Sequence, residues 1–136
     1  MKINICYVKI LISILIYRYK MKEILFNVME DNHKIRNIKI KLGENAKENW
    51  DLLKNSDQNY WWIHLDAYPS GYVIIEDEDP PEEVIQDAML ICKDNTKYKK
   101  IRNLYFCMTQ IKNLKKEEKL GEVSFKSNKK VKKLKI

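Results

Sequence analysis

The chain has 136 residues, of which 45% are hydrophobic and 33% charged, and it contains only three Gly and three Pro. This length fits one domain with a modest packed core, and the scarcity of Gly and Pro excludes a fibrous or largely disordered chain. Residues 1–109 carry 16 basic and 16 acidic side chains, whereas residues 110–136 carry 10 Lys and 3 Glu, so the net charge of +7 lies entirely in the last segment. Such a block is typical of a phosphate-binding surface or of a solvated lysine-rich tail.

The first twenty residues differ from the rest. Residues 10–17 form an apolar run that Lys9 and Arg18 bracket, and it is shorter than the roughly 18 residues needed to span a bilayer. No small-residue cleavage site follows, which disfavours a signal peptide. We therefore expect residues 1–20 to be an extension outside the core and residues 21–136 to form the domain, beginning at Met21. An N-terminal strand or a membrane-surface segment is the alternative.

The next elements are a strand and a helix. Residues 38–42 alternate Ile, Ile and Leu with Lys, the pattern of a half-buried strand, and Gly43 ends it. Asn45 stands three residues before Glu48, a capping-box arrangement that predicts the start of a helix. The apolar face of this helix is predicted to contain Ala46, Trp50 and Leu53, with Trp50 packed inward.

Residues 60–75 predict an aromatic hairpin, because two apolar runs flank a Pro-Ser-Gly turn. In the first strand, Trp62 and His64 share one face, and a simple register places Tyr72 beside them. The opposite face is purely apolar and is the better core face; it contains Trp61, Ile63 and Leu65. The strip of Trp62 and His64 is then either a surface that stacks on unpaired bases or a set of buried structural side chains.

A second helix is predicted after an acidic run at residues 76–83. Asp79 suits the N-cap, Pro80 the first helical position, and Glu82 the capping box. The acidic run is interpreted as a solvated helix start favoured by the helix dipole, not as a metal site. The apolar face is predicted to contain Val84, Ile85, Ala88, Met89 and Cys92.

The remaining chain predicts strands. Residues 104–109 form a continuous apolar run, consistent with a central strand covered on both faces. Val123 and Phe125 alternate with polar residues, Ser127 and Asn128 make a turn, and residues 131–136 are expected to close a lysine-rich terminal hairpin. The predicted fold is therefore α+β, a single domain in which two or more helices pack on a mostly antiparallel sheet.

No cofactor or metal is expected. Cys6, Cys92 and Cys107 form no CxxC pair, and with His33 and His64 they match no structural zinc spacing. Their odd number and apolar neighbours suggest reduced, buried thiols in a cytoplasmic protein.

Catalysis has little support in the sequence. His64, Asp66 and Ser70 fall within seven positions, but no glycine-rich nucleophile turn accompanies them. Neither GxxxxGK nor GxGxxG occurs. We therefore expect no enzyme; a small hydrolase centred on His64 is the alternative.

Several segments resemble the RNA-binding domain of the NFACT proteins, also called DUF814. They are residues 43–52 (Gly-Glu-Asn-Ala-Lys-Glu-Asn-Trp-Asp-Leu), 62–65 (Trp-Ile-His-Leu), 69–74 (Pro-Ser-Gly-Tyr-Val-Ile), 113–116 (Asn-Leu-Lys-Lys) and 121–123 (Gly-Glu-Val). The resemblance extends over residues 24–136 and includes the short proteins of the coiled-coil domain-containing 25 type. Tyr72 is a departure from it, because the family commonly has a histidine there.

The resemblance implies a non-catalytic module that binds rRNA or tRNA near the large ribosomal subunit, in the setting of rescue of stalled nascent chains. Lysines would contact phosphates and release counterions. A protein-interaction adaptor, whose basic C-terminal hairpin meets an acidic protein partner, is the alternative. The candidate RNA-binding residues are Trp62, His64, Ser70, Tyr72, Lys112, Lys115, Lys116, Lys119, Lys129, Lys130, Lys132 and Lys133.

Overall fold

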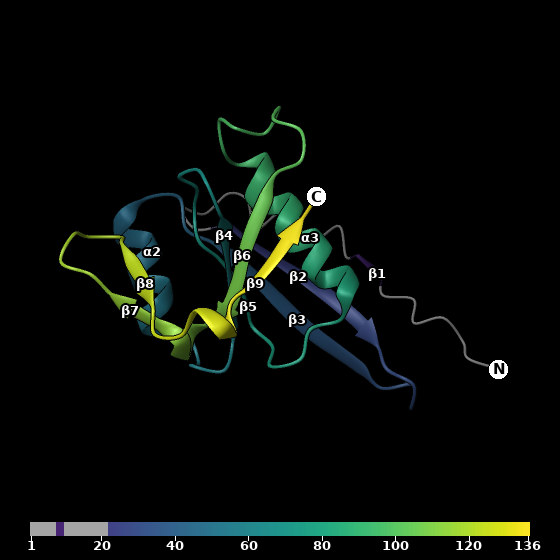
Figure 1. Ribbon diagram of the computed structural model, residues 1–136. Helices are drawn as coiled ribbons and strands as arrows, with labels where there is room; N and C mark the ends of the chain where they lie inside the picture. The colour runs from purple at the N-terminus through teal and green to yellow at the C-terminus, as the bar shows by residue number, and fades with distance from the viewer. Residues whose placement is uncertain (1–7, 10–21) are drawn as a thin grey trace.

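The structure, a computed structural model, describes residues 8–9 and 22–136. Most strands join a seven-stranded sheet in the order β1-β2-β3-β5-β4-β6-β9, in which all neighbours are antiparallel (Figure 1). These strands are β1 (Val8–Lys9), β2 (Lys22–Met29), β3 (Ile35–Leu42), β4 (Trp61–Leu65), β5 (Val73–Ile75), β6 (Tyr105–Gln110) and β9 (Lys132–Lys135). The predicted α+β fold is confirmed.

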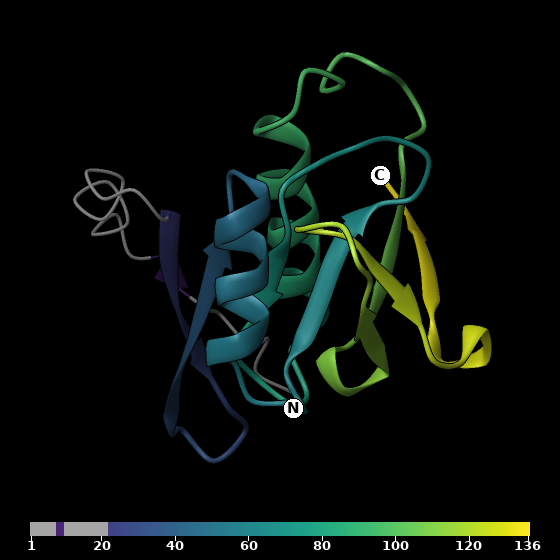
Figure 2. The same ribbon diagram turned by 90° about the vertical axis from the view of Figure 1, so that its left-hand side faces the viewer.

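Two helices cover opposite faces of this sheet (Figures 1 and 2). α3 (Glu82–Asp94) packs on the face that contains Ile63, Leu65 and Val73. α2 (Ala46–Asn55) packs on the other face, which contains Trp62 and Ile74. A small sheet of β7 (Leu114–Lys116) and β8 (Val123–Phe125) covers this second face beside α2. Both faces of the central strands are therefore buried.

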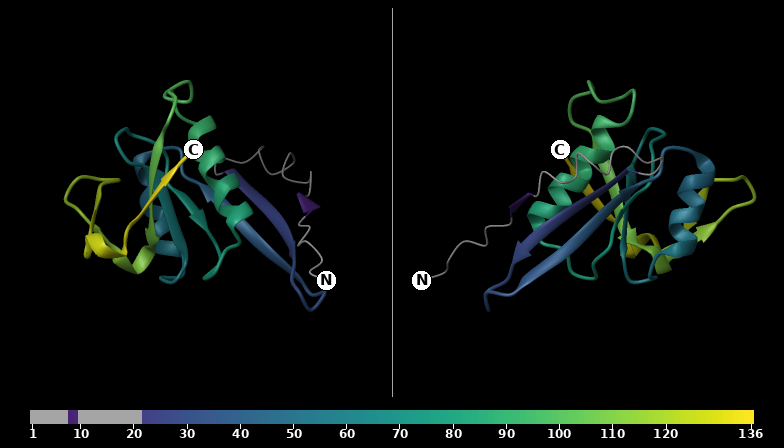
Figure 3. Two further views of the ribbon diagram at one scale, coloured as in Figure 1. Left: turned by 45° about the vertical axis from the view of Figure 1, so that its right-hand side comes forward. Right: turned by 180° about the vertical axis from the view of Figure 1, so that it is seen from behind.

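The alternating pattern predicted at residues 38–42 is confirmed in β3. Ile38, Ile40 and Leu42 are buried, and the lysines between them are partly exposed. β2 pairs with β3 along its whole length, and this hairpin extends past the rest of the sheet (Figure 3). Its far end carries Ile35, which is 64% exposed.

α2 begins where the capping box predicts, but it presents a different face to the sheet. The Asn45 side chain accepts the Glu48 N–H at 2.9 Å. Asn49, Leu52 and Leu53 are buried, whereas Trp50 is half-buried and packs against the same core cluster, so its predicted inward packing is confirmed only in part. The reason is a polar contact: Asn49 Oδ1 accepts the Tyr72 N–H at 3.1 Å, which turns Asn49 toward the sheet and Trp50 about 100° away.

α3 begins at Glu82, later than predicted, with Pro81 at the N-cap and no side-chain cap. The residue before a proline avoids helical geometry, so Pro81 keeps Pro80 extended and delays the helix. Asp79 does not cap the helix; its N–H instead donates to Asp77 Oδ2 at 3.0 Å. The predicted apolar face is confirmed at the buried residues Val84, Ala88, Met89 and Cys92, while Ile85 is half-buried.

The predicted lysine-rich terminal hairpin is wrong. β8 pairs with β7, and β9 pairs with β6, where Leu134 lies opposite Phe106. The Asn113 side chain accepts the Ser127 N–H and donates to the Ser127 carbonyl, both at 2.9 Å, which holds the chain as it leaves β8. η2 (Asn128–Lys130) then redirects the chain, and Leu134 packs against the core on the α3 side. Packing of Leu134 against the core therefore favours pairing of β9 with β6 over a local hairpin with β8.

The predicted extension at residues 1–20 falls outside the described residues except at β1, where Val8 lies opposite Asn27. The division into residues 1–20 and 21–136 stays a prediction. Within residues 8–9 and 22–136, no helix has the length and apolar character to cross a membrane. Cys92 and Cys107 are free and buried as predicted, and Cys6 lies outside the described range.

Candidate nucleic-acid interface

The aromatic hairpin forms as predicted, but its strip is largely covered. β4 and β5 pair so that Trp62 lies opposite Ile74, which places Tyr72 next to His64 with ring centroids 5.4 Å apart. The Trp62 and His64 rings are parallel, with centroids 5.5 Å apart, and Phe125 of β8 meets Trp62 edge-on at 5.8 Å. Trp62 is 3% exposed. Trp62 is therefore a buried structural side chain, the second of the two alternatives, and not an exposed stacking surface.

His64 is half-buried and uncharged at neutral pH. Its Nδ1 lies 2.6 Å from the Leu65 carbonyl oxygen, so Nδ1 carries the proton that is donated. Burial lowers the pKa of His64, because desolvation disfavours the charged ring more than the backbone carbonyls of Leu65 and Ser70 and the nearby Asp66 carboxylate favour it. In the neutral ring, Nε2 remains as a hydrogen-bond acceptor.

A cavity of about 550 Å³ opens beside His64, between the β4–β5 loop and the β7–β8 hairpin. Asp66 and Lys133 form an ion pair at its edge. The Cys107 thiol, 3.0 Å from Asp66 Oδ1, and the Lys133 ammonium hold the pKa of Asp66 below its ordinary value. Burial raises the pKa of Cys107 to about 11, so this thiol stays protonated.

Ser70 and Tyr72 are structural in this arrangement. The Ser70 hydroxyl accepts the Leu65 N–H at 3.1 Å and lies 3.2 Å from the Gly71 carbonyl, to which it donates. The Tyr72 hydroxyl donates to the Gly121 carbonyl and thereby joins the main sheet to the β7–β8 hairpin. Burial raises the pKa of Tyr72 to about 12. The His64, Asp66 and Ser70 side chains therefore bind different partners and do not form a triad.

The predicted lysines do not form a single surface. Lys112 and Lys130 line a second cavity of about 340 Å³ together with Lys126, a residue that the sequence reasoning missed. Lys129 is exposed in the neighbouring η2, and the Lys132 ammonium lies 4.8 Å from the centroid of the Trp61 ring. Five cationic side chains therefore lie in or beside this cavity and η2: Lys112, Lys126, Lys129, Lys130 and Lys132.

The other predicted lysines lie apart from this cavity. Lys115 and Lys116 point to alternate faces of β7, and the Lys116 ammonium lies 5.1 Å from the centroid of the Trp50 ring. Lys119 forms an exposed ion pair of 3.6 Å with Glu122. Lys133 is on the face of β9 opposite to Lys132, beside the His64 cavity.

A basic loop at residues 95–104 was missed entirely. It connects α3 to β6 and exposes Lys97, Lys99, Lys100 and Arg102. Its charges were hidden by the balance of acidic and basic residues over the first 109 positions. Counting charge over a shorter window would have revealed them, because residues 95–104 hold four basic side chains and no acidic one.

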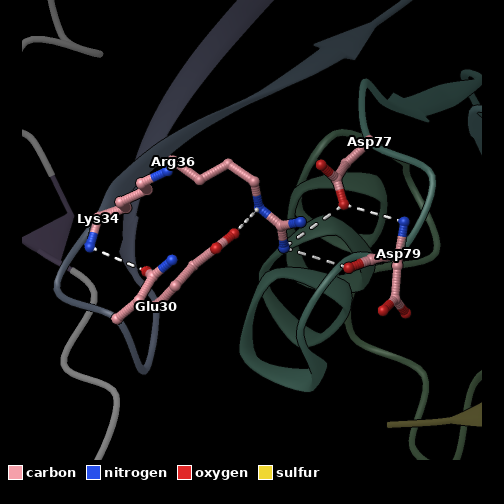
Figure 4. Close-up of polar contacts among 6 residues, drawn as sticks. Glu30, Lys34, Arg36, Asp77 and Asp79 are labelled. Atoms are coloured by element: carbon pink, nitrogen blue, oxygen red, sulfur yellow. Dashed lines mark hydrogen bonds and ion pairs between the residues drawn. The ribbon is translucent and has the colours of Figure 1, made fainter.

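The acidic run lies at the other end of α3. Arg36 of β3 contacts two residues of this run. Its Nη2 lies 3.2 Å from the Asp79 carbonyl oxygen and 3.6 Å from Asp77 Oδ2 (Figure 4). Arg36 Nε also lies 3.1 Å from Glu30 Oε1, a close ion pair without hydrogen-bond geometry. Glu82 and Glu83 occupy the first turn of α3, as expected for the start of a helix.

Comparison with known proteins identifies the domain. Residues 22–127 match the family described as NFACT protein RNA binding domain. The chain belongs to the NFACT RNA-binding domain family. This membership confirms the resemblance drawn from the sequence motifs. The matched residues include the candidates from Trp62 to Lys119, whereas Lys129, Lys130, Lys132 and Lys133 lie beyond them.

Two known proteins align with this chain over segments of nearly equal length. Protein JLP2 of Saccharomyces cerevisiae is 36% identical over 100 residues, 65% of this chain and 48% of that protein. Coiled-coil domain-containing protein 25 of Danio rerio is 30% identical over 102 residues, 68% of this chain and 49% of that protein. The chain thus spans about half the length of these relatives.

A solved structure supports the fold. The C-terminal part of the fibronectin/fibrinogen-binding protein from Streptococcus suis superposes with a TM-score of 0.66 at 24% sequence identity. The match covers 81% of this chain and 43% of that chain. At this identity the likeness concerns the arrangement of helices and strands alone.

Proposed function

We propose that this protein binds structured RNA, rRNA or tRNA, by shape and charge, on the large ribosomal subunit and in the cytoplasm. The observation that carries the proposal is membership of an RNA-binding domain family together with lysines gathered around a cavity. Lys112, Lys126 and Lys130 border that cavity and contact phosphates in the proposed complex. Basic side chains gain affinity there by releasing condensed counterions.

The proposed role involves no chemistry. His64 is uncharged, Cys107 is protonated, and the Ser70 hydroxyl is bonded to backbone groups. The pKa of Cys107 is raised although Asp66 accepts from its thiol, and Ser70 donates to a backbone carbonyl, so neither side chain is an activated nucleophile. The side chains around the His64 cavity therefore support binding better than catalysis.

Filter binding of tRNA and of a large-subunit rRNA fragment, at several salt concentrations, tests the proposal. Replacing Lys112, Lys126 and Lys130 with Gln should weaken binding of both RNAs. The slope of log affinity against log salt should become shallower by roughly 0.7 to 0.9 for each phosphate that the protein no longer neutralises. A matched variant with Gln at Lys34, Lys47 and Lys54, which are exposed elsewhere, controls for net charge.

An unchanged slope in a folded lysine variant would remove this cavity from the interface. Crosslinking followed by sequencing identifies the bound RNA. Nuclease treatment of a pull-down separates RNA binding from the adaptor alternative, because an acidic protein partner survives the nuclease. Loss of all partners after nuclease is the expected result.

A further inference from the structure

Two loops meet at the end of the sheet where β4 ends and β6 begins. The β4–β5 loop and the basic loop at residues 95–104 lie together at this end (Figures 1 and 2). The Tyr68 and Tyr98 rings stack across them with centroids 4.5 Å apart and an interplanar angle of 27°. The Thr96 hydroxyl lies 3.5 Å from the Pro69 carbonyl oxygen. These contacts hold the loops in place before any partner binds.

The basic loop carries charge that no carboxylate of the described residues neutralises. Lys97, Lys99, Lys100 and Arg102 are exposed, and none forms an ion pair within residues 8–9 and 22–136. Asp66, an acidic residue of the facing loop, is already paired with Lys133. This surface therefore has a net positive potential that favours a polyanion.

The tyrosine stack leads into the His64 cavity. The Lys97 ammonium lies 5.3 Å from the centroid of the Tyr98 ring, whose neighbour in the stack is Tyr68. Tyr68, 36% exposed, also lines the cavity, whose volume is in the range of small-ligand sites. A planar ligand in the cavity would extend a stack that is already formed.

The cavity also offers a polar group for recognition. His64 lines it, and the Nδ1 contact with the Leu65 carbonyl leaves Nε2 to accept a hydrogen bond. Nucleobases carry ring or amino N–H donors that fit such an acceptor. Apolar walls with one or two placed polar groups are the usual composition of a small-ligand site.

We propose that this end of the sheet binds an unpaired RNA nucleotide, with its base stacked on Tyr68 in the cavity and its flanking phosphates on Lys97, Lys99 and Lys100. The inference rests on the proposed RNA-binding function and adds a site distinct from the Lys112 cavity. An unpaired base is required because the faces of bases within a duplex are covered by their neighbours. The partner is thus a single-stranded loop or end within a structured RNA.

Fluorescence of a short single-stranded RNA with one 2-aminopurine tests the stacking, alongside filter binding of the same RNA and a duplex. Binding to the full chain should quench the fluorophore. Tyr68→Ala should abolish the quench and lower single-strand affinity by about fivefold or more, with little change for the duplex. Tyr68→Phe keeps the ring and should behave as the wild type. Tyr105→Ala removes another exposed tyrosine, and the quench should remain.

The basic loop has its own arm of the experiment. Gln at Lys97, Lys99 and Lys100 should weaken single-strand binding and make its salt slope shallower by about 0.7 for each phosphate left without its lysine. Gln at Lys34, Lys47 and Lys54 is the matched control and should change the slope less. Circular dichroism confirms folding, and Tyr68→Leu, which keeps apolar volume without a ring, replaces Tyr68→Ala if that variant unfolds.

The outcomes separate this inference from the proposed function. If the wild type binds RNA but Tyr68→Ala or Tyr68→Leu keeps both the quench and the affinity, the nucleotide site is wrong and the proposed function stands. If the basic-loop variant loses single-strand and duplex RNA equally, the surface binds phosphates without an unpaired base, and the inference again fails. A wild type that binds neither short RNA overturns the nucleotide site, and one that also fails to bind tRNA and the rRNA fragment overturns the proposed function itself.

Discussion

The two ends of α3 carry opposite charge, and they differ in how that charge is satisfied. At the N-terminal end, Asp77 contacts Arg36 and the Asp79 N–H, and two glutamates face the helix dipole. At the C-terminal end, the lysines and Arg102 of the basic loop have no carboxylate partner among the described residues. The charges of the acidic end thus have partners within the protein, whereas those of the basic end are available to a molecule outside it.

This contrast has a consequence for orientation. A polyanion approaching the molecule is attracted to the basic loop and repelled from the residues around Glu82. α3 is the element that separates the two ends (Figure 1). The charge pattern therefore favours one direction of docking before any specific contact forms.

The strongest way to break the contrast is to make both ends acidic. Glu at Lys97, Lys99 and Lys100 should lower affinity for single-stranded RNA by about 100-fold or more at low salt, because attraction becomes repulsion. The free energy of unfolding should change little, since these side chains are exposed. Filter binding and urea denaturation measure the two quantities. Equal losses in a variant with Glu at Lys34, Lys47 and Lys54 would mean that only net charge matters.

Removing Arg36 tests whether the acidic end is structural. Arg36→Ala deletes contacts to Glu30, Asp77 and the Asp79 carbonyl. The free energy of unfolding should fall by about 1 to 2 kcal/mol, since the guanidinium is partly exposed and its ion pairs are screened. Urea denaturation gives the value, with Lys34→Ala as a neighbouring control. A loss of RNA affinity without a loss of stability would contradict this assignment.

Neutralising the acidic end should have a smaller effect on binding. Gln at Glu78, Glu82 and Glu83 removes exposed negative charge and should raise RNA affinity only about two- to threefold at low salt, vanishing at high salt. Stability should fall by a few tenths of a kcal/mol for each glutamate removed from the first turn of α3. A tenfold gain in affinity would place RNA close to this end instead.

The smallest effect concerns pH at the basic end. The folded-state pKa of Asp66 is lowered, so its contribution to stability is present above the ordinary carboxyl pKa of about 3.9 and is lost as pH falls through the lower folded value. Lys133→Gln should reduce this acid-dependent loss by less than about 1 kcal/mol, because the pair is exposed. Urea melts from about pH 6 to about pH 2 measure it, with Lys132→Gln as control. Identical pH profiles for the wild type and Lys133→Gln would mean that the Asp66–Lys133 ion pair does not contribute to stability.

Local patterns in the sequence predicted the elements well where one physical rule dominates. Side-chain alternation identified β3 and β4, and the capping box identified the start of α2. The start of α3 was missed because two adjacent prolines act on each other, which a single-residue capping rule ignores. Trp50 packs against the core less deeply than predicted, because a buried amide, Asn49, took the inward position that hydrophobicity alone assigns to tryptophan.

Features that depend on distant residues could not be predicted locally. The pairing of β9 with β6 joins residues 24 to 30 positions apart, and nothing in the lysine-rich segment itself specifies that partner. The Tyr68–Tyr98 stack likewise joins two loops far apart in the chain. The lysines of the C-terminal segment were predicted by number, but only the fold shows which of them share a cavity.

β9 forms one edge of the main sheet, and three of its four residues are lysines. An open edge offers unpaired backbone groups to strands of other molecules, and charged side chains there discourage sheet-to-sheet aggregation. Lys132, Lys133 and Lys135 therefore protect solubility whether or not RNA is bound. Substituting them with Val should turn the edge into a template for self-association, so the edge position accounts for these lysines without any contact to RNA.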